Sequence, residues 1–163
     1  MGRTVPAPWK ISGQVDTIMS VNRVDDVLSL FKKGFNCAQS LLAVYGNELG
    51  IEYGTALKLA STFGGGIARK GDTCGAVTGA LMVIGLKFGT ADVKNKASSA
   101  RTYELSREFI KRFQARNSST ICRDLLGFDI SLKDKLEAED SKKIFTQCPA
   151  YVKDAADILE EIL

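Results

Sequence analysis

The residues of this chain best suited to carry out chemistry are its four cysteines: Cys37, Cys74, Cys122 and Cys148. The local sequence predicts that each stands where a helix begins. A helix N-terminus presents unpaired N–H groups and the positive end of the helix dipole, and both favour the loss of a proton from a thiol placed there. The thiolate is the form that attacks disulfides and binds metals. The four positions therefore predict a site built on sulfur.

The predicted helix starts rest on the residues beside each cysteine, which are of helix-capping or helix-initiating types. These residues are Asn36, Asp72-Thr73, Ser118-Ser119-Thr120 and Pro149. The alternative is that each cysteine is a small apolar side chain packed in the core. Packing alone accounts well for any single cysteine, but it does not explain why all four stand at helix starts.

A glycine-rich segment leads into the second cysteine. A phosphate-binding loop is rejected here, because the segment follows a predicted helix instead of a strand and Lys70 is not placed as in a GxxxxGK[ST] motif. We expect four glycines to let the backbone pass close to the sulfur site, where their N–H groups would donate to sulfur. They are Gly64, Gly65, Gly66 and Gly75. The alternative is a plain glycine-rich helix stop.

The chain contains no histidine. This excludes Ser-His-Asp and Cys-His catalytic pairs, a histidine-ligated haem and a mixed Cys/His zinc site. The cysteines form no CxxC pair, which removes the zinc-ribbon and thioredoxin signatures. Dispersed cysteines can still converge where a helical bundle brings several helix starts to one end.

Composition places the chain among ordinary soluble globular proteins. Its 163 residues suit one domain, with 45% hydrophobic and 25% charged residues. The net charge of +3 is modest and no nucleic-acid recognition motif accompanies it, so we expect no nucleic-acid partner. The longest apolar run is shorter than the roughly 20 residues that span a bilayer. With no secretory signal visible, we expect a cytoplasmic protein with reduced cysteines.

Apolar periodicity predicts an all-α, single-domain bundle of about six to eight helices. An irregular arm over 1–20 precedes the four-cysteine helical redox domain, which we place at 21–163. The predicted helices cover about 24–33, 37–49, 53–63, 74–88, 91–116, a short stretch after 122, 131–145 and 149–163. The 74–88 helix is apolar nearly all round and is predicted to be the buried central helix. On it, Gly75 and Gly79 share one face and would let a neighbouring helix approach closely.

Several of these residues together resemble the C_GCAxxG_C_C family of putative redox-active proteins. The similarity runs from about residue 21 to the C-terminus and is carried by Phe35 to Ser40, Phe63 to Gly66, Cys74 to Gly79, Cys122, and Cys148-Pro149. The family label spells the motif GCAxxG, whereas this chain reads Cys-Gly-Ala. The resemblance implies a helical domain with redox or metal chemistry at the four cysteines. In the related domain of split-Soret cytochromes, four cysteines hold an iron–sulfur cluster; this chain has no CxxCH and cannot attach c-type haem as those proteins do.

The leading hypothesis is a single redox-active site formed by the four cysteines. In one version they hold an iron–sulfur cluster, with the two-iron type favoured; in the other they are metal-free and cycle between dithiol and disulfide. The alternative is a non-catalytic helical module with a structural Cys₄ zinc site or simply packed cysteines. A redox partner of unknown identity is expected. A homodimer through an exposed apolar helix face and partner docking through the arm around Trp9 stay open.

Overall fold

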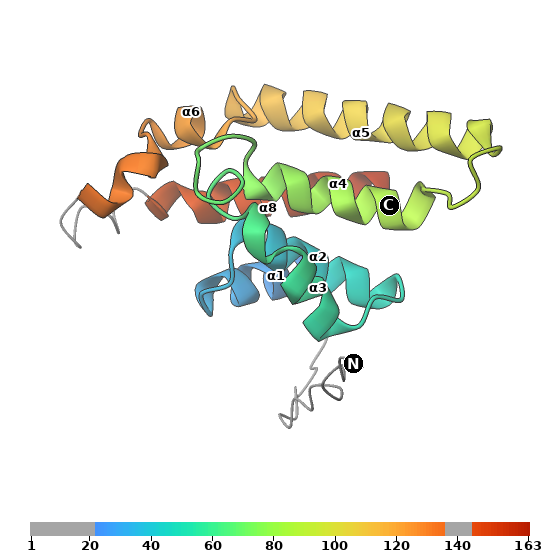
Figure 1. The fold of residues 1–163 in the computed structure, drawn as a ribbon, viewed down its shortest axis with the longest axis horizontal. Helices are drawn as coiled ribbons and strands as arrows, with labels where there is room; N and C mark the ends of the chain where they lie inside the picture. The colour runs from blue at the N-terminus through green and yellow to red at the C-terminus, as the bar shows by residue number, and fades with distance from the viewer. Residues whose placement is uncertain (1–21, 136–144) are drawn as a thin grey trace, which may run out of the picture.

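The computed structural model describes residues 22–135 and 145–163, so the predicted arm over 1–20 lies outside the described residues. Within these two ranges the chain forms seven α-helices joined by short loops and 3₁₀ turns, and no strand. The α-helices are α1 (Arg23–Lys32), α2 (Cys37–Glu48), α3 (Tyr53–Leu59), α4 (Gly75–Phe88), α5 (Lys96–Asn117), α6 (Cys122–Leu126) and α8 (Cys148–Ile162). The prediction of an all-α fold is confirmed (Figure 1).

Helix α4 occupies the centre of the fold, as its apolar sequence predicts. It packs against α2, α5 and α8, while α1 packs against α2 and α8. Figure 1 shows the long α5 running beside α4 and α8, with α1, α2 and α3 on the other side. Val77, Val83 and Ile84 on α4 are fully or almost fully buried. The exposed residues of this helix, Gly85, Leu86 and Lys87, lie near its C-terminal end.

Two predicted helix bounds are wrong for local reasons. The helix expected from 91 begins only at Lys96, because Asp92 forms a turn in which its side chain accepts the N–H of Lys94. Such local side-chain bonds offer the backbone an alternative to a helix. The helix expected over 53–63 ends at Leu59 and continues as the 3₁₀ turn Ser61–Phe63.

The helix expected over 131–145 lies partly outside the described residues. Its start forms the 3₁₀ helix η2 (Ile130–Lys135), and a second 3₁₀ turn, η3 (Phe145–Gln147), leads into α8. The part between these two turns is not described.

The small-residue face of α4 lets α2 approach closely. A Cβ atom added at Gly79 would lie 2.9 Å from the Cα atom and 3.0 Å from the carbonyl oxygen of Ala38 on α2. At Gly75 it would lie 3.0 Å from the carbonyl oxygen of Phe63 and 3.1 Å from the Cβ atom of Cys37. The predicted close approach of a neighbouring helix is confirmed, and it brings the start of α2 against the start of α4.

Alanine substitution should therefore have opposite effects at two glycines of α4, Gly79 and Gly85. Gly79→Ala is expected to lower the free energy of unfolding by about 1–3 kcal/mol, because it forces α2 and α4 apart. Gly85→Ala is the matched control, since a Cβ there meets nothing within 4 Å. It should raise the stability by about 0.5–1 kcal/mol through helix propensity. Urea unfolding measures both, and a shift of the same sign in the two variants would contradict the packing argument.

Candidate functional site

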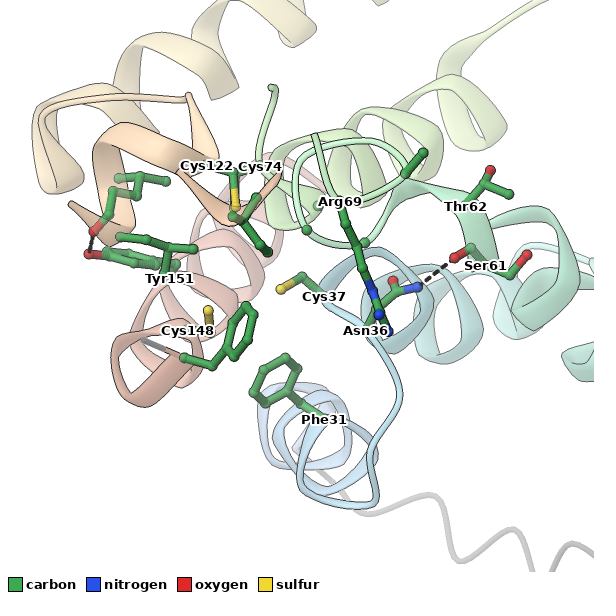
Figure 2. A pocket seen from close by; sticks show the side chains of 18 residues that line it. Phe31, Asn36, Cys37, Ser61, Thr62, Arg69, Cys74, Cys122, Cys148 and Tyr151 are labelled. Carbon is green, nitrogen blue, oxygen red and sulfur yellow. Dashed lines mark hydrogen bonds between the residues drawn. The ribbon is translucent and has the colours of Figure 1, made fainter. Parts of the chain in front are cut away.

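The four cysteines line one cavity of about 460 Å³. Helices α2, α6 and α8 begin at Cys37, Cys122 and Cys148, and Cys74 is the N-cap residue of α4. The prediction that each cysteine stands at a helix start is confirmed. Figure 2 shows the four residues around the cavity, with the sulfur atoms of Cys37 and Cys148 pointing into it. The structure thus brings together the residues expected to form the site, while their chemical role stays a prediction.

All four thiols are reduced and shielded from bulk solvent. The exposed fractions are 9% for Cys37, 4% for Cys74, 6% for Cys122 and 5% for Cys148, and none is in a disulfide. As the described side chains stand, no group of three or more cysteine, aspartate or glutamate residues could hold a single metal ion. A reaction partner must therefore enter the cavity to reach sulfur.

The thiol of Cys74 is the one whose ionised form the surroundings stabilise. A hydrogen-bonding interaction with the Cys37 thiol is the main cause that lowers the pKa of Cys74. The backbone N–H groups of Ala76 and Val77 at the start of α4 lower this pKa further, and burial opposes them only in part. The α4 N-terminus thus acts on sulfur as a helix N-terminus is expected to act.

The same expectation is wrong for two other cysteines. Hydrogen bonding to Cys148 and Cys74, together with burial, holds the pKa of Cys37 well above its ordinary value. Burial, and to a smaller extent coulombic effects of the neighbouring cysteines, raise the pKa of Cys122 to about 12. The benefit of the helix dipole is outweighed at Cys37 by hydrogen bonds that favour the protonated thiol, and at Cys122 by the cost of removing a thiolate from water. The four thiols are therefore not equivalent.

Residues predicted as caps before Cys74 and Cys122 have a different role. Neither α4 nor α6 has a side-chain cap hydrogen bond. Instead, the two segments pair with each other: the N–H of Cys74 donates to the carbonyl of Thr120 over 2.8 Å, and the N–H of Cys122 donates to the carbonyl of Asp72 over 2.7 Å. The short antiparallel pairing ties the starts of α4 and α6 together and holds these cysteines next to each other.

The glycines approach the cysteines closely, as expected, but they supply no N–H group to the Cys74 sulfur. A Cβ atom at Gly66 would lie 2.7 Å from the Cβ of Cys122, and one at Gly75 would lie 3.1 Å from the Cβ of Cys37. Gly64, Gly65 and Gly75 line the cavity. The backbone donors that lower the pKa of Cys74 belong to Ala76 and Val77. The glycines therefore leave space for the cysteine side chains, and the N–H groups in the first turn of α4 interact with the Cys74 sulfur.

One feature of the site was not predicted from the sequence: a left-handed backbone turn over residues 65–69. The φ angles of Gly65, Gly66, Ile67, Ala68 and Arg69 are 64°, 68°, 57°, 51° and 60°. Left-handed backbone costs an L-residue about 1–2 kcal/mol, and such strain gathers at functional sites. The adjacent glycines were the only sequence signal, and they do not predict that three L-residues follow in the same conformation.

Apart from Arg69, the rest of the cavity wall combines apolar and uncharged polar side chains. The apolar ones are Phe31, Leu125, Leu126, Ile130, Phe145 and Tyr151, and the polar ones are Asn36, Ser61 and Thr62. The Tyr151 hydroxyl donates to the carbonyl of Leu125 over 2.7 Å and so fixes its ring at the wall. A volume of about 460 Å³ lies within the range of small-molecule sites, roughly 300–1,000 Å³. None of the helices in the described ranges is long and apolar enough to cross a membrane.

The fold and the site together define an all-α protein with a buried four-cysteine cavity. The family described as "Putative redox-active protein (C_GCAxxG_C_C)" matches residues 35–162, and the chain belongs to this family. The four cysteines that line the cavity all lie within the matched residues. No curated protein matches the chain, and no solved structure does.

Proposed function

We propose that the protein is a thiol–disulfide redox protein in which Cys74 is the attacking sulfur and Cys37 the resolving one. The observation that carries the proposal is the arrangement of this pair: both thiols line one cavity and interact, and two N–H groups of α4 stabilise the Cys74 thiolate. Membership of a redox-active family supports it. The domain is taken as residues 21–163, with the arm over 1–20 outside the redox unit.

The proposed reaction is a two-step exchange with an external disulfide. The Cys74 thiolate attacks one sulfur of that disulfide, the external S–S bond breaks, and the first thiolate leaves. The Cys37 thiol then gives up its proton, and its sulfur attacks the Cys74 sulfur of the mixed disulfide. The second external thiolate leaves and takes up the proton, so the protein loses two electrons and the external disulfide gains them. A dithiol partner reverses both steps and restores the reduced protein.

The raised pKa of Cys37 suits a resolving role. A thiol that stays protonated does not compete with Cys74 for the first attack, and it holds Cys74 in place by hydrogen bonding until the mixed disulfide forms. Once Cys74 is in a covalent bond, its negative charge is gone. The contributions of Cys74 to the raised pKa of Cys37 disappear with it, while those of Cys148 and of burial remain. The first step therefore makes it easier for Cys37 to lose its proton and resolve the mixed disulfide.

The second candidate function is binding of an iron–sulfur cluster, and the observation in its favour is that all four thiols face one cavity. Four cysteine thiolates are the ordinary ligand set of two-iron and four-iron clusters. Cys37, Cys74, Cys122 and Cys148 would hold the cluster, which would supply one-electron transfer. The N–H groups of Ala76 and Val77 beside Cys74 would then tune its potential. To bind a cluster, Cys37 and Cys122 would have to lose the protons that their raised pKa values retain near neutral pH.

Disulfide mapping tests the first proposal. The reduced full-length protein is treated under argon with one equivalent of a small disulfide, trapped with an alkylating agent and digested. We expect one protein disulfide, between Cys37 and Cys74, with Cys122 and Cys148 still alkylated. Cys37→Ser should accumulate a mixed disulfide at Cys74, and Cys122→Ser should still form the Cys37–Cys74 bond. A protein that takes up no oxidising equivalent, or that forms a different bond, contradicts the proposal.

The visible spectrum and metal content of protein purified without oxygen test the second candidate. Charge-transfer absorption with about two iron atoms per chain, lost in Cys→Ser variants, would support a two-iron cluster. Stoichiometric zinc without colour would support a structural Cys₄ site. A colourless, metal-free protein with four titratable thiols would leave the dithiol function as the explanation of the site.

A further inference from the structure

The cavity carries a charge that the exchange reaction does not use. Of the residues that line it, Arg69 is the only one with a cationic side chain. No ion pair or side-chain hydrogen bond involves this guanidinium within the described part of the protein. Figure 2 shows the Arg69 side chain extending from its loop toward Asn36, beside the region that holds the cysteines. An arginine placed on a ligand cavity without an acidic partner is free to bind an anion.

The backbone holds this arginine in place at an energetic cost. Arg69 ends the left-handed turn, and its N–H donates to the carbonyl of Gly64 over 3.2 Å. Just beyond the turn, the N–H of Asp72 donates to the carbonyl of Gly66 over 2.9 Å, and the Asp72 carboxylate pairs with Arg123 over 2.5 Å. The loop that carries Arg69 is therefore fixed to the same two helix starts that position Cys74 and Cys122.

Burial of the cysteines limits the size of the partner. Because the four sulfur-bearing residues are at most 9% exposed, a disulfide on the surface of a folded protein cannot meet Cys74 unless the site opens. A small molecule can enter a cavity of this volume and rest on its apolar wall. An anionic molecule would be repelled by the Cys74 thiolate, and the guanidinium offsets that repulsion at the cavity mouth.

From these observations we propose that Arg69 selects small disulfides that bear a carboxylate, by pairing with that group while the disulfide reaches Cys74. The inference rests on the proposed exchange function and adds the substrate class to it. Asn36 and Ser61 line the same side of the cavity as Arg69, and the apolar wall around Leu126 receives the aliphatic part of the molecule.

The test compares three small disulfides of similar size: dithiodipropionate is anionic, dithiodiethanol is neutral and cystamine is cationic. The rate of protein oxidation by each is measured for the full-length wild type and for Arg69→Gln. The quantity compared is the anionic-to-neutral rate ratio, in which the intrinsic reactivity of each disulfide cancels between variants. We expect this ratio to fall about tenfold in Arg69→Gln, the size expected for losing one charge-assisted hydrogen bond.

Three controls separate recognition from general charge. Lys70→Gln removes the neighbouring exposed cation, which does not line the cavity, and should leave the ratio unchanged. Arg69→Lys should retain part of the preference, since it keeps the charge but loses the planar fork. High salt should weaken the preference, because the guanidinium is exposed. An equal ratio in wild type and Arg69→Gln, or an equal fall in Lys70→Gln, overturns the inference and leaves the exchange function standing.

A binding measurement makes failure of the function distinguishable from failure of the inference. Suberate has the chain length and carboxylates of dithiodipropionate but no disulfide to reduce. Calorimetry should show that it binds the wild type and that Arg69→Gln weakens binding by about tenfold. If no disulfide oxidises the protein, the exchange function and the substrate class both fall, and suberate binding then decides only whether Arg69 is an anion site.

Discussion

Iodoacetamide is expected to modify Cys74 at least about fifty times faster than Cys122 in the reduced protein near neutral pH. The pKa of Cys74 lies below the ordinary value of a thiol, and that of Cys122 is raised to about 12. An ordinary thiol is already ionised roughly a thousand times more often near neutral pH than a thiol of pKa about 12, so Cys74 exceeds Cys122 by at least this factor. The more basic Cys122 thiolate is the stronger nucleophile, which reduces the ratio by about twentyfold. Both residues are at least 94% shielded from solvent, so accessibility does not reverse the order.

The pH dependence of this labelling has a definite sign. A thiol reacts faster as pH rises toward its pKa and reaches a constant rate above it, because the thiolate is then fully formed. Labelling of Cys74 should level off below the pH at which an ordinary thiol does, whereas labelling of Cys122 should still increase at pH 11. Mass spectrometry of the digested protein after timed labelling measures each site separately.

Two cysteine variants test whether the fastest-labelled thiol is that of Cys74. Cys74→Ser should remove the fast phase entirely, and Cys122→Ser should leave its rate unchanged within about twofold. If Cys122 or Cys37 were labelled first in the wild type, the proposed direction of attack would be wrong.

Local sequence signals of the predicted kind are present at the starts of the helices that begin at Cys37 and Cys148. Asn36 accepts the N–H of Gln39 while the Gln39 side chain accepts the N–H of Asn36, a capping box that the sequence around Cys37 encodes within four residues. Pro149 in the first turn of α8 acts in the same short range. Gly34 ends the preceding segment with a φ of 100°. Each of these signals needs only neighbouring residues, so no knowledge of the fold was required.

The differences among the thiols could not be predicted in this way, because they arise from contacts between distant segments. The raised pKa of Cys37 depends on Cys148, which lies more than a hundred residues away in the chain. The pairing of the segments before Cys74 and Cys122 likewise depends on how α4 and α6 meet. From local capping preferences, the residues before Cys74 and Cys122 were expected to cap the helices that follow them. In the structure their backbone groups pair with each other and connect α4 to α6 instead.

The loop that carries Gly66 is expected to be the part of the site that tolerates substitution least. Gly66 has a φ of 68°, and a Cβ there would lie 2.6 Å from the backbone nitrogen of Asp72 and 2.7 Å from the Cβ of Cys122. Real Cβ atoms do not tolerate such contacts with backbone, so the loop or α6 would have to move. Gly66→Ala is expected to lower the free energy of unfolding by about 3 kcal/mol or more, from backbone strain and overpacking together.

Gly127→Ala is the matched control, because it isolates the strain from the contact. Gly127 has a nearly identical φ of 63°, but a Cβ there meets nothing within 4 Å. Gly127→Ala should lower the free energy of unfolding only by the cost of holding an L-residue in the left-handed region, about 1–2 kcal/mol. Urea unfolding gives both values, and equal losses would show that the contact with Asp72 and Cys122 is unimportant. Timed alkylation gives a second measurement. In Gly66→Ala the labelling rates of Cys74 and Cys122 should become more similar, because a displaced α6 exposes Cys122 to water. In Gly127→Ala the difference between the two rates should be preserved.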